Sequence, residues 1–340
     1  MESSGAISVA ELGEEAVLAA IFPTLPNSSS AVIGPGDDSA GVRSEGVTLL
    51  TTDTMVAGRD FNVEWSSPSD LGIKAVASNF ADIAAMGAVP SALLVALTLP
   101  PSTKLKWVLE FAAGLASGVS RLAPEAGIVG GDLALGDQLH IAITAVGSLP
   151  EGQAVLRSGA RAGDRVAIAG RQGRSAAGLA LLTEGFGDIE PRLDKSGLVR
   201  QLITAHLSPE PPILLGAAAR LAGASSMIDV SDGLVRDAGR IAKASSVSID
   251  LSAAKLAQFV EPLVAAAELI ESDSTKALLL ARDWVHQGGE DHCLLATFPR
   301  GSQLPGGFVE IGEVSKSGEL AVLLDGEPIA AAGWDSLSSR

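Results

Sequence analysis

The order of apolar segments in the first half of this sequence constrains the fold more than any other feature. Continuously apolar or β-branched runs predict strands at residues 31–33, 47–52, 92–99, 127–129 and 139–146. Helical patterns predict helices that begin near Ser8, Pro68 and Lys104 and end near residues 22, 87 and 122. Strands and helices therefore do not alternate one by one, as they do in a parallel βαβ sheet. The order predicts an α+β domain with a mixed or antiparallel sheet.

A second domain is expected because the chain has 340 residues, more than one typical core needs. The polar segment at residues 150–153 predicts the boundary, which gives an N-terminal domain of residues 1–149 and a C-terminal domain of residues 150–340. Beyond it, strands are predicted at residues 165–169, 226–228, 292–298, 308–314 and 320–324. Helices are predicted at residues 175–183, 195–205, 212–221 and 234–244. The related inventories of the two halves suit two similarly built α+β domains.

Composition and charge exclude several classes of protein. The formal net charge of −16 argues against nucleic acid as a partner, because nucleic-acid affinity comes mainly from Lys and Arg on phosphates. The one cysteine, Cys293, excludes an internal disulfide framework and a Cys-based zinc cluster. The polar N-terminus does not resemble a signal peptide, and no apolar run is long enough to span a membrane. We therefore expect a cytoplasmic protein without a membrane segment.

Aspartates recur beside apolar runs and give the main indication of a site. Asp37 and Asp38 follow a Gly-Pro-Gly turn, and because adjacent extended residues point to opposite sides, we expect one to face a site and the other to hold the loop. Others lie at predicted strand ends, on a Gly-Gly turn or on a helix: Asp53, Asp82, Asp132, Asp229 and Asp232. Structural alternatives are a solvated helix face for Asp82 and a helix N-cap for either Asp229 or Asp232.

The residue types favour magnesium and a nucleotide over other site chemistries. Carboxylate oxygens suit Mg²⁺, which proteins usually hold with one or two carboxylates plus substrate phosphates. The four histidines, His140, His206, His286 and His292, lack ligand spacing, so zinc is not expected. A Walker motif is absent, so a nucleotide would be bound by metal ions and Gly-rich backbone.

Several motifs together resemble one enzyme family. In chain order they are GPGDDSAGV, TTDTMVAGRDF, GIKAVASNFADIAAMGAVPSALLVALTLP, GGDLALGDQL, RSGARAGD, MIDVSDGLVRDAGRIAKAS and GGEDHCLLATFP. Their order and spacing resemble those of thiamine-monophosphate kinases over roughly residues 10–335. The surrounding superfamily of ATP users also contains aminoimidazole-ribonucleotide synthetase, selenophosphate synthetase and a hydrogenase-maturation protein.

This resemblance implies a fold, an assembly and a set of site residues. The fold would be a two-domain PurM-like α+β fold, with an N-terminal ATP- and metal-binding domain that pairs in a homodimer. The C-terminal α/β sandwich-like domain would complete the nucleotide and acceptor site, and ATP would be bound with several Mg²⁺ ions. The implied metal positions are Asp38, Thr51, Thr52, Asp53, Asp82, Asp132, Asp229 and Asp232. The implied ATP contacts are Gly131, Asp132, Arg157 and Ser231, and the implied acceptor contacts are Glu290, Trp334 and the family position that Asp60 occupies.

The activity implied is ATP- and Mg²⁺-dependent phosphorylation of thiamine monophosphate to thiamine diphosphate by direct in-line transfer. The acceptor phosphate has a second pKa near ~6 and is largely ionised at neutral pH, so no catalytic side chain is required as a base. Glu290 and Trp334 suit the cationic aromatic end of thiamine through charge and stacking.

Three departures from the family pattern concern the acceptor. Asp60 stands where the family commonly has His, His292-Cys293 stand where it has Tyr-Glu, and Pro212 replaces an Arg. We expect thiamine monophosphate to bind more weakly than in a typical member. The alternatives are a related ATP-dependent kinase or synthetase with a different phosphorylated acceptor, and a catalytically idle metal- or nucleotide-binding homologue.

Overall fold

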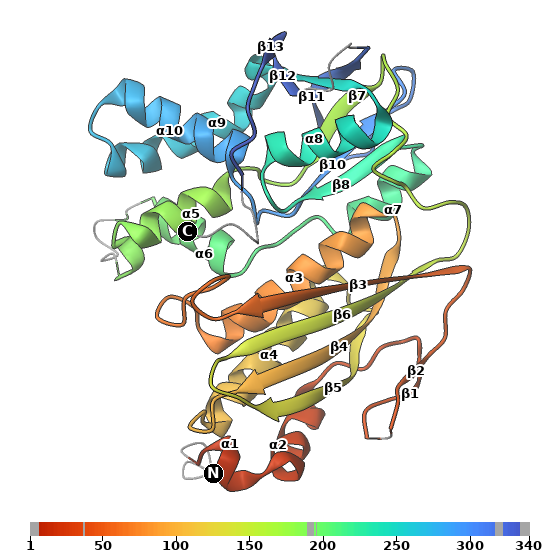
Figure 1. The fold of residues 1–340 in the computed structure, drawn as a ribbon, viewed down its shortest axis with the longest axis vertical. Coiled ribbons are helices and arrows are strands. Elements are labelled where there is room, and N and C mark those ends of the chain that lie inside the picture. The colour runs from red at the N-terminus through yellow and green to blue at the C-terminus, as the bar shows by residue number, and fades with distance from the viewer. Residues whose placement is uncertain (1–6, 37, 189–193, 195, 317–321, 334–340) are drawn as a thin grey trace. The chain divides into compact units, whose positions relative to one another are not determined.

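The computed structural model describes residues 7–36, 38–188, 194, 196–316 and 322–333. The chain forms two compact units, which we call unit 1 (residues 1–83 and 88–153) and unit 2 (residues 84–87 and 154–340). Both combine helices with sheets, which confirms the predicted α+β class (Figure 1). Within the described part of the chain, no helix is both long and apolar enough to cross a membrane.

Unit 1 is built on a four-stranded sheet with the order β3-β6-β4-β5. The strands are β3 (Val47–Val56), β6 (His140–Leu149), β4 (Val89–Leu99) and β5 (Gly127–Leu135). Strands β4 and β5 are parallel, whereas the β3–β6 and β4–β6 pairs are antiparallel. The predicted mixed sheet is therefore confirmed.

Helices cover one face of this sheet, which we call the inner face (Figure 1). They are α3 (Pro68–Ala85) and α4 (Leu105–Leu122). Beyond the β5 edge lie α1 (Val9–Leu12), α2 (Glu14–Ile21) and the short 3₁₀ helix η2 (Phe22–Thr24), and both α2 and η2 contact α4. The predicted capping box is present at Ser8, and Ser67 caps α3 by accepting a hydrogen bond from the Asp70 backbone N. Glycines let α3 and α4 approach closely, since a Cβ on Gly114 would lie 2.2 Å from the Ser69 carbonyl oxygen.

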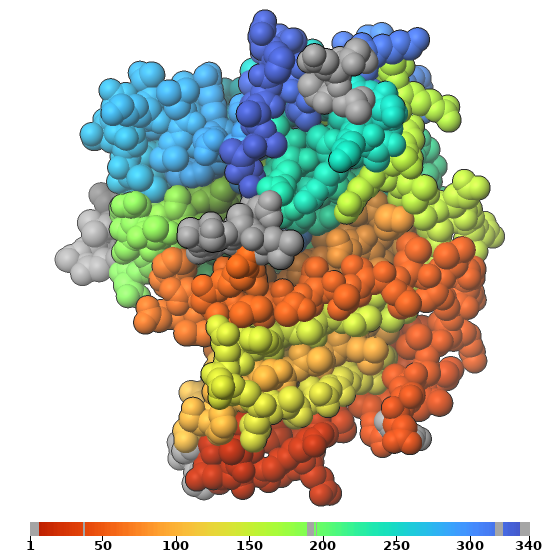
Figure 2. All heavy atoms as spheres, viewed as in Figure 1, coloured from red at the N-terminus to blue at the C-terminus, as the bar shows by residue number. Residues whose placement is uncertain are grey.

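The opposite, outer face of the sheet is partly covered by a short hairpin. The hairpin strands are β1 (Ala31–Ile33) and β2 (Gly41–Val42), and they pack against a small cluster that contains Ala92 and Val146. Elsewhere the outer face carries exposed side chains, including Leu50 at 69% and Leu94 at 37% exposure. Figure 2 shows the sheet strands β3, β6, β4 and β5 side by side at the surface of unit 1.

Unit 2 contains a seven-stranded sheet with the order β13-β12-β9-β11-β7-β10-β8. The strands are β7 (Arg165–Ala169), β8 (Ser226–Val230), β9 (Ser248–Leu251), β10 (Cys293–Phe298), β11 (Phe308–Ser315), β12 (Val322–Leu324) and β13 (Glu327–Pro328). Only the β12–β9 pair among these is parallel. The helices are α5 (Arg174–Thr183), η3 (Phe186–Asp188), α6 (Leu198–Leu207), α7 (Leu214–Leu221), α8 (Leu234–Ser245), α9 (Ala253–Ile270) and α10 (Ser274–Gln287).

The predicted turn at residues 130–132 needs correction, and several elements of unit 2 were not predicted. Residues 130–132 do not form a turn, because they lie inside strand β5. Glycine is required there for packing, since a Cβ on Gly131 would lie 2.0 Å from the Val95 carbonyl oxygen of β4. Strand β9 and helices α9 and α10 were not predicted, although α10 has a clear N-cap in Asp273, which accepts hydrogen bonds from the Thr275 and Lys276 backbone N atoms.

Candidate active site

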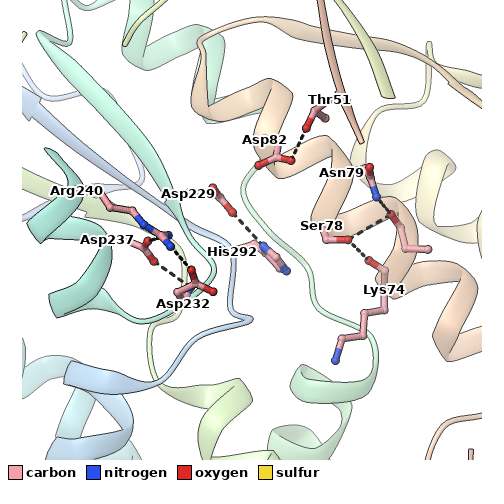
Figure 3. A network of polar contacts seen from close by, with 11 residues as sticks. Thr51, Lys74, Ser78, Asn79, Asp82, Asp229, Asp232, Asp237, Arg240 and His292 are labelled. Carbon is pink, nitrogen blue, oxygen red and sulfur yellow. Dashed lines mark hydrogen bonds and ion pairs between the residues drawn. The ribbon is translucent and has the colours of Figure 1, made fainter. Parts of the chain in front are cut away.

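The inner face of strand β3 directs two of the expected oxygen ligands, Thr51 and Asp53, toward a third, Asp82 on helix α3. The Thr51 hydroxyl donates a hydrogen bond of 2.8 Å to Asp82 Oδ2 (Figure 3). Asp53 lies two residues further along the strand and therefore shares the side of Thr51. The solvated helix face suggested for Asp82 is wrong, since this side chain is half-buried and bonded to the sheet.

Helix α3 carries a polar stripe at four-residue spacing, formed by Lys74, Ser78 and Asp82 (Figure 3). Lys74 is only 5% exposed, and the Ser78 hydroxyl donates to the Lys74 carbonyl oxygen at 3.1 Å. A buried lysine is unusual in proteins unless it is paired. Its spacing from Asp82 was visible in the sequence, but the sequence analysis did not assign it a role.

Thr52 points away from this group. Its hydroxyl donates to the Ile143 carbonyl oxygen at 2.8 Å and accepts from the Thr144 hydroxyl at 3.4 Å. Adjacent residues of a strand face opposite sides of the sheet, so Thr52 lies on the outer face while Thr51 lies on the inner face. The structure thus separates two neighbouring residues that the sequence analysis grouped together.

A cavity of about 870 Å³ gathers other expected residues at the β5 side of unit 1. Asp38, Gly131 and Asp132 line it together with Thr144, and most of the remaining lining is apolar. Asp132 lies on the outer face. It pairs with Ala96 of β4, which pairs with Ala142 of β6, and Ala142 is on the same side of β6 as Thr144. Asp37 lies outside the described residues.

In unit 2, Asp229 is paired with a histidine. Asp229 is 4% exposed at the end of β8, and its Oδ2 lies 3.1 Å from Nδ1 of His292, which is 6% exposed. The His292 backbone N also donates to the Val230 carbonyl oxygen at 3.1 Å. The residue that departs from the family pattern here therefore contacts an expected metal ligand directly (Figure 3).

Asp232 is held by an arginine and does not cap helix α8. The cap position is Gly233, and no side chain makes a cap hydrogen bond there. Arg240 bridges Asp232 and the fully buried Asp237 through two ion pairs, so the N-cap suggested for Asp232 is wrong. Burial raises the pKa of Asp237 to about 6, although the Arg240 charge and the hydrogen bond from the Asp232 backbone N act in the opposite direction.

The loop before β10 holds Glu290 beside Ser231. The Glu290 backbone N donates to the Ser231 carbonyl oxygen at 2.9 Å, and a Cβ on Gly289 would lie 2.1 Å from that oxygen. Glu290 adopts a φ of 61°, a left-handed conformation that is uncommon for residues other than glycine. Asp291 accepts hydrogen bonds from the Gly173 and Ser175 backbone N atoms at 2.6 and 2.8 Å and so anchors this loop to the start of α5.

The remaining expected residues have separate environments. Asp60 Oδ2 accepts a hydrogen bond of 2.8 Å from the Val56 backbone N and closes the turn after β3. Arg157 is exposed, and its carbonyl oxygen accepts from the Ser245 hydroxyl at 3.0 Å. Burial raises the pKa of the Cys293 thiol, which agrees with a packing role. Trp334 lies outside the described residues.

Comparison with known proteins places this arrangement in a family. Residues 36–149 match the N-terminal domain of the AIR synthase related protein family. The thiamine-monophosphate kinase of Mycobacterium tuberculosis is 42% identical over 328 residues, which cover 96% of this chain and 92% of that protein. The chain belongs to the thiamine-monophosphate kinase family.

Solved structures of this kinase family have similar folds. The thiamine-monophosphate kinase from Stenotrophomonas maltophilia K279a matches with a TM-score of 0.75 and 29% identity, over 94% of this chain and 98% of that one. AaThiL complexed with AMPPCP and TMP matches with a TM-score of 0.72 and 28% identity, over 96% and 98% of the two chains. The matches confirm the predicted family and the predicted PurM-like fold.

The donor set of this family member fits a hard cation. Among the residues that the structure describes, no three His, Cys, Asp or Glu side chains converge on one point as a ready-made metal site. Thr51, Asp53 and Asp82 nevertheless offer hydroxyl and carboxylate oxygens on one face of unit 1. Oxygen donors of this kind suit Mg²⁺, which keeps several waters and binds substrate phosphates in addition to a few protein ligands.

Proposed function

We propose that this protein transfers the γ-phosphoryl group of ATP to thiamine monophosphate and releases thiamine diphosphate and ADP. The observation that carries the proposal is the near full-length identity of 42% to a thiamine-monophosphate kinase. It is supported by a structural match to AaThiL complexed with AMPPCP and TMP. The proposed co-substrate, ATP, also favours a cytoplasmic location.

The chemistry needs positioning more than a catalytic base. An oxygen of the acceptor phosphate forms a bond to the γ-phosphorus, and the bond from that phosphorus to the β–γ bridging oxygen breaks as ADP leaves. Since the second pKa of a phosphate monoester is near ~6, the attacking oxygen is already ionised at neutral pH. The protein must therefore align two anionic groups, and an acidic chain needs cations for that purpose.

We propose that Mg²⁺ ions are held by the acidic and hydroxyl positions of both units. Bound Mg²⁺ would neutralise charge on the transferring phosphoryl group. In unit 1 the proposed ligands are Asp38, Thr51, Thr52, Asp53, Asp82 and Asp132, and in unit 2 they are Asp229 and Asp232. The proposed ATP contacts are Gly131, Asp132, Arg157 and Ser231.

For the acceptor we propose that Glu290 attracts the cationic rings of thiamine and that Trp334 stacks on them. Asp60 is engaged by the Val56 backbone N and carries no positive charge. We therefore propose weaker binding of the acceptor phosphate than in a family member with His at this position.

We propose in addition that two copies pair through the outer face of the unit 1 sheet. Leu50 and Leu94 are 69% and 37% exposed on that face, and pairing of two copies would cover both side chains. Light scattering at micromolar concentration should show a dimer, and a stable monomer would contradict this assembly.

An ADP-release assay with a panel of phosphate monoesters tests the proposed function. With ATP and Mg²⁺, thiamine monophosphate should give faster ADP release than any other acceptor in the panel, with formation of thiamine diphosphate. The altered residues Asp60, His292 and Cys293 favour a second candidate, a related kinase with another phosphorylated acceptor. Turnover of a different monoester without turnover of thiamine monophosphate would support that candidate.

A further inference from the structure

Two buried side chains of unit 2 lie directly behind the proposed acceptor residue Glu290. His206, on α6, has its Nδ1 atom 3.3 Å from Glu290 Oε2, and Ser175, on α5, has its hydroxyl 3.0 Å from the same Nδ1 atom. The side chains of His206 and Glu290 are 7% and 35% exposed. The histidine is thus inside the unit, while part of the carboxylate is accessible to a ligand.

The close approach of a carboxylate indicates which nitrogen of His206 carries a proton. A carboxylate only accepts hydrogen bonds, so the close approach of Glu290 Oε2 requires a proton on Nδ1 of His206. The Ser175 hydroxyl oxygen then accepts from the same N–H. An imidazole can donate through Nδ1 without a positive charge, so this contact orients Glu290 and leaves its negative charge in place.

Ser175 also connects this pair to the loop that carries Glu290. Its backbone N donates to Asp291 Oδ1 at 2.8 Å, so one residue of α5 holds both the His206 ring and the residue next to Glu290. Because the Glu290 backbone is in the left-handed region, the loop needs such external contacts to persist. Ser175 is 1% exposed, which leaves it little freedom to move.

We infer that His206 is a positioning residue for the acceptor site, and that Ser175 fixes its ring. His206 holds the Glu290 carboxylate in the orientation that receives a cationic nitrogen heterocycle. This inference rests on the proposed function, because it takes Glu290 as the acceptor contact. It concerns recognition of the acceptor and leaves ATP binding unaffected.

A matched pair of substitutions tests the role of the Nδ1 donor. Asn places its amide nitrogen near the position of His Nδ1, whereas Gln places its amide nitrogen near the position of Nε2. His206→Gln should raise the KM for thiamine monophosphate about tenfold, the expected effect of losing one hydrogen bond to a charged group. His206→Asn should stay within about threefold of wild type, and Ser175→Ala should raise this KM about threefold. The KM for ATP and kcat should change less than about twofold in all three variants, the pattern of lost ground-state binding.

Binding is measured separately from turnover, by calorimetric titration of thiamine monophosphate into the protein with AMPPCP and Mg²⁺. Glu290→Gln is the reference variant, with a KM for thiamine monophosphate raised between about tenfold and a hundredfold. Equal behaviour of His206→Asn and His206→Gln, or an unchanged KM in His206→Gln while Glu290→Gln is impaired, would overturn the inference alone. A wild-type protein that does not phosphorylate thiamine monophosphate would overturn the proposed function and this inference with it. Thermal unfolding of each variant identifies any that fails to fold. If the His206 variants fail to fold, the KM of Ser175→Ala for thiamine monophosphate decides, because this substitution is the smallest change.

Discussion

In unit 1 a hydroxyl, that of Thr51, contacts the carboxylate of Asp82, whereas in unit 2 nitrogen donors contact the acidic side chains. Asp229 is paired with an imidazole and Asp232 with a guanidinium. The Arg240 guanidinium compensates the charge of the Asp232 carboxylate within the chain itself. We therefore expect substitutions at Asp82 to act mainly on turnover, through the proposed Mg²⁺, and substitutions around Asp232 to act mainly on stability.

The largest effect should come from removing a charge in unit 1. Asp82→Asn should lower kcat/KM by about a thousandfold, because a metal ligand contributes several kcal/mol to stabilising a transferring phosphoryl group. The melting temperature should change little. Steady-state kinetics over a range of Mg²⁺ concentrations measures the effect.

Asp70 provides a control on the same helix. It lies in the first turn of α3, where its carboxylate accepts from the Ser67 hydroxyl. Asp70→Asn should cost about 1 kcal/mol of stability through the cap and leave turnover intact. Near-normal turnover of Asp82→Asn at low Mg²⁺ would contradict the proposed role of Asp82 as a Mg²⁺ ligand.

In unit 2 the larger effect should be on stability. Arg240→Gln leaves the buried Asp237 without its cation, which should lower the free energy of unfolding by about 2 kcal/mol, below the usual range for buried pairs because Arg240 is 35% exposed. Asp237→Asn in the same protein should restore most of the loss. Thr51→Val, the matched change in unit 1, should cost only about 1 kcal/mol.

Urea unfolding of the single and double variants measures these differences. Equal losses for Arg240→Gln and Thr51→Val would remove the contrast between the units. A double variant no more stable than Arg240→Gln would show that Asp237 is not the source of the loss.

A smaller effect is expected at Asp60, the altered acceptor position in unit 1. Asp60→His should lower the KM for thiamine monophosphate about threefold with a modest change in kcat, as expected for ground-state binding. It should also cost about 1 kcal/mol of stability, because the hydrogen bond to the Val56 backbone N is lost.

Weak acceptor binding could come from the negative charge of Asp60 or from the missing His side chain, and Asp60→Asn separates these two causes. It removes the charge and keeps an acceptor oxygen for the Val56 backbone N. If the KM falls equally in both variants, repulsion by the Asp60 carboxylate is the cause of weak binding. A KM unchanged in both would contradict a role for this position in acceptor binding.

The smallest effect should be a change in the pH dependence of stability, through Asp291. Burial raises the pKa of this carboxyl from 3.8 to about 7, against the effect of its two backbone hydrogen bonds and of His292. A raised pKa means that the folded protein favours the neutral form. The stabilisation is therefore complete below pH 3.8 and is lost as the pH rises through about 7.

Asp291→Asn does not titrate and isolates this contribution. The unfolding free energy of wild type minus that of the variant should fall as the pH rises from about 4 and should level off above about pH 7. Urea unfolding at several pH values measures it. A difference that grows with pH would mean that the two backbone hydrogen bonds outweigh burial.

The sequence predicted those parts of the fold and site that local chemistry determines. The Ser8 capping box, the start of α3 at Pro68 and the order of helices and strands along unit 1 follow from caps and apolar periodicity. The pairing of Thr51 with Asp82 was not evident, because it joins a strand to a helix 31 residues away. The β5 strand was predicted too short because glycines usually mark turns, whereas Gly131 serves close strand packing.

The partners of the unit 2 carboxylates were missed for a similar reason. His206 and Glu290 are 84 positions apart, and nothing in the spacing of the histidines indicates their contact. The contact between Arg240 and Asp237 is easier to recognise in the sequence, because the two residues are three positions apart on one helix face. The acidic residues are evident from the sequence, whereas the side chains that hold them come from distant elements.

The most direct test of the account follows the transferred phosphoryl group itself. Wild-type protein and Asp82→Asn are incubated with ATP labelled at the γ-phosphate, Mg²⁺ and thiamine monophosphate, and the labelled products are separated. The account predicts label in thiamine diphosphate with wild type and a loss of about a thousandfold in its rate of formation with Asp82→Asn. Label that appears only in inorganic phosphate, or equal labelling of thiamine diphosphate by both proteins, would contradict it.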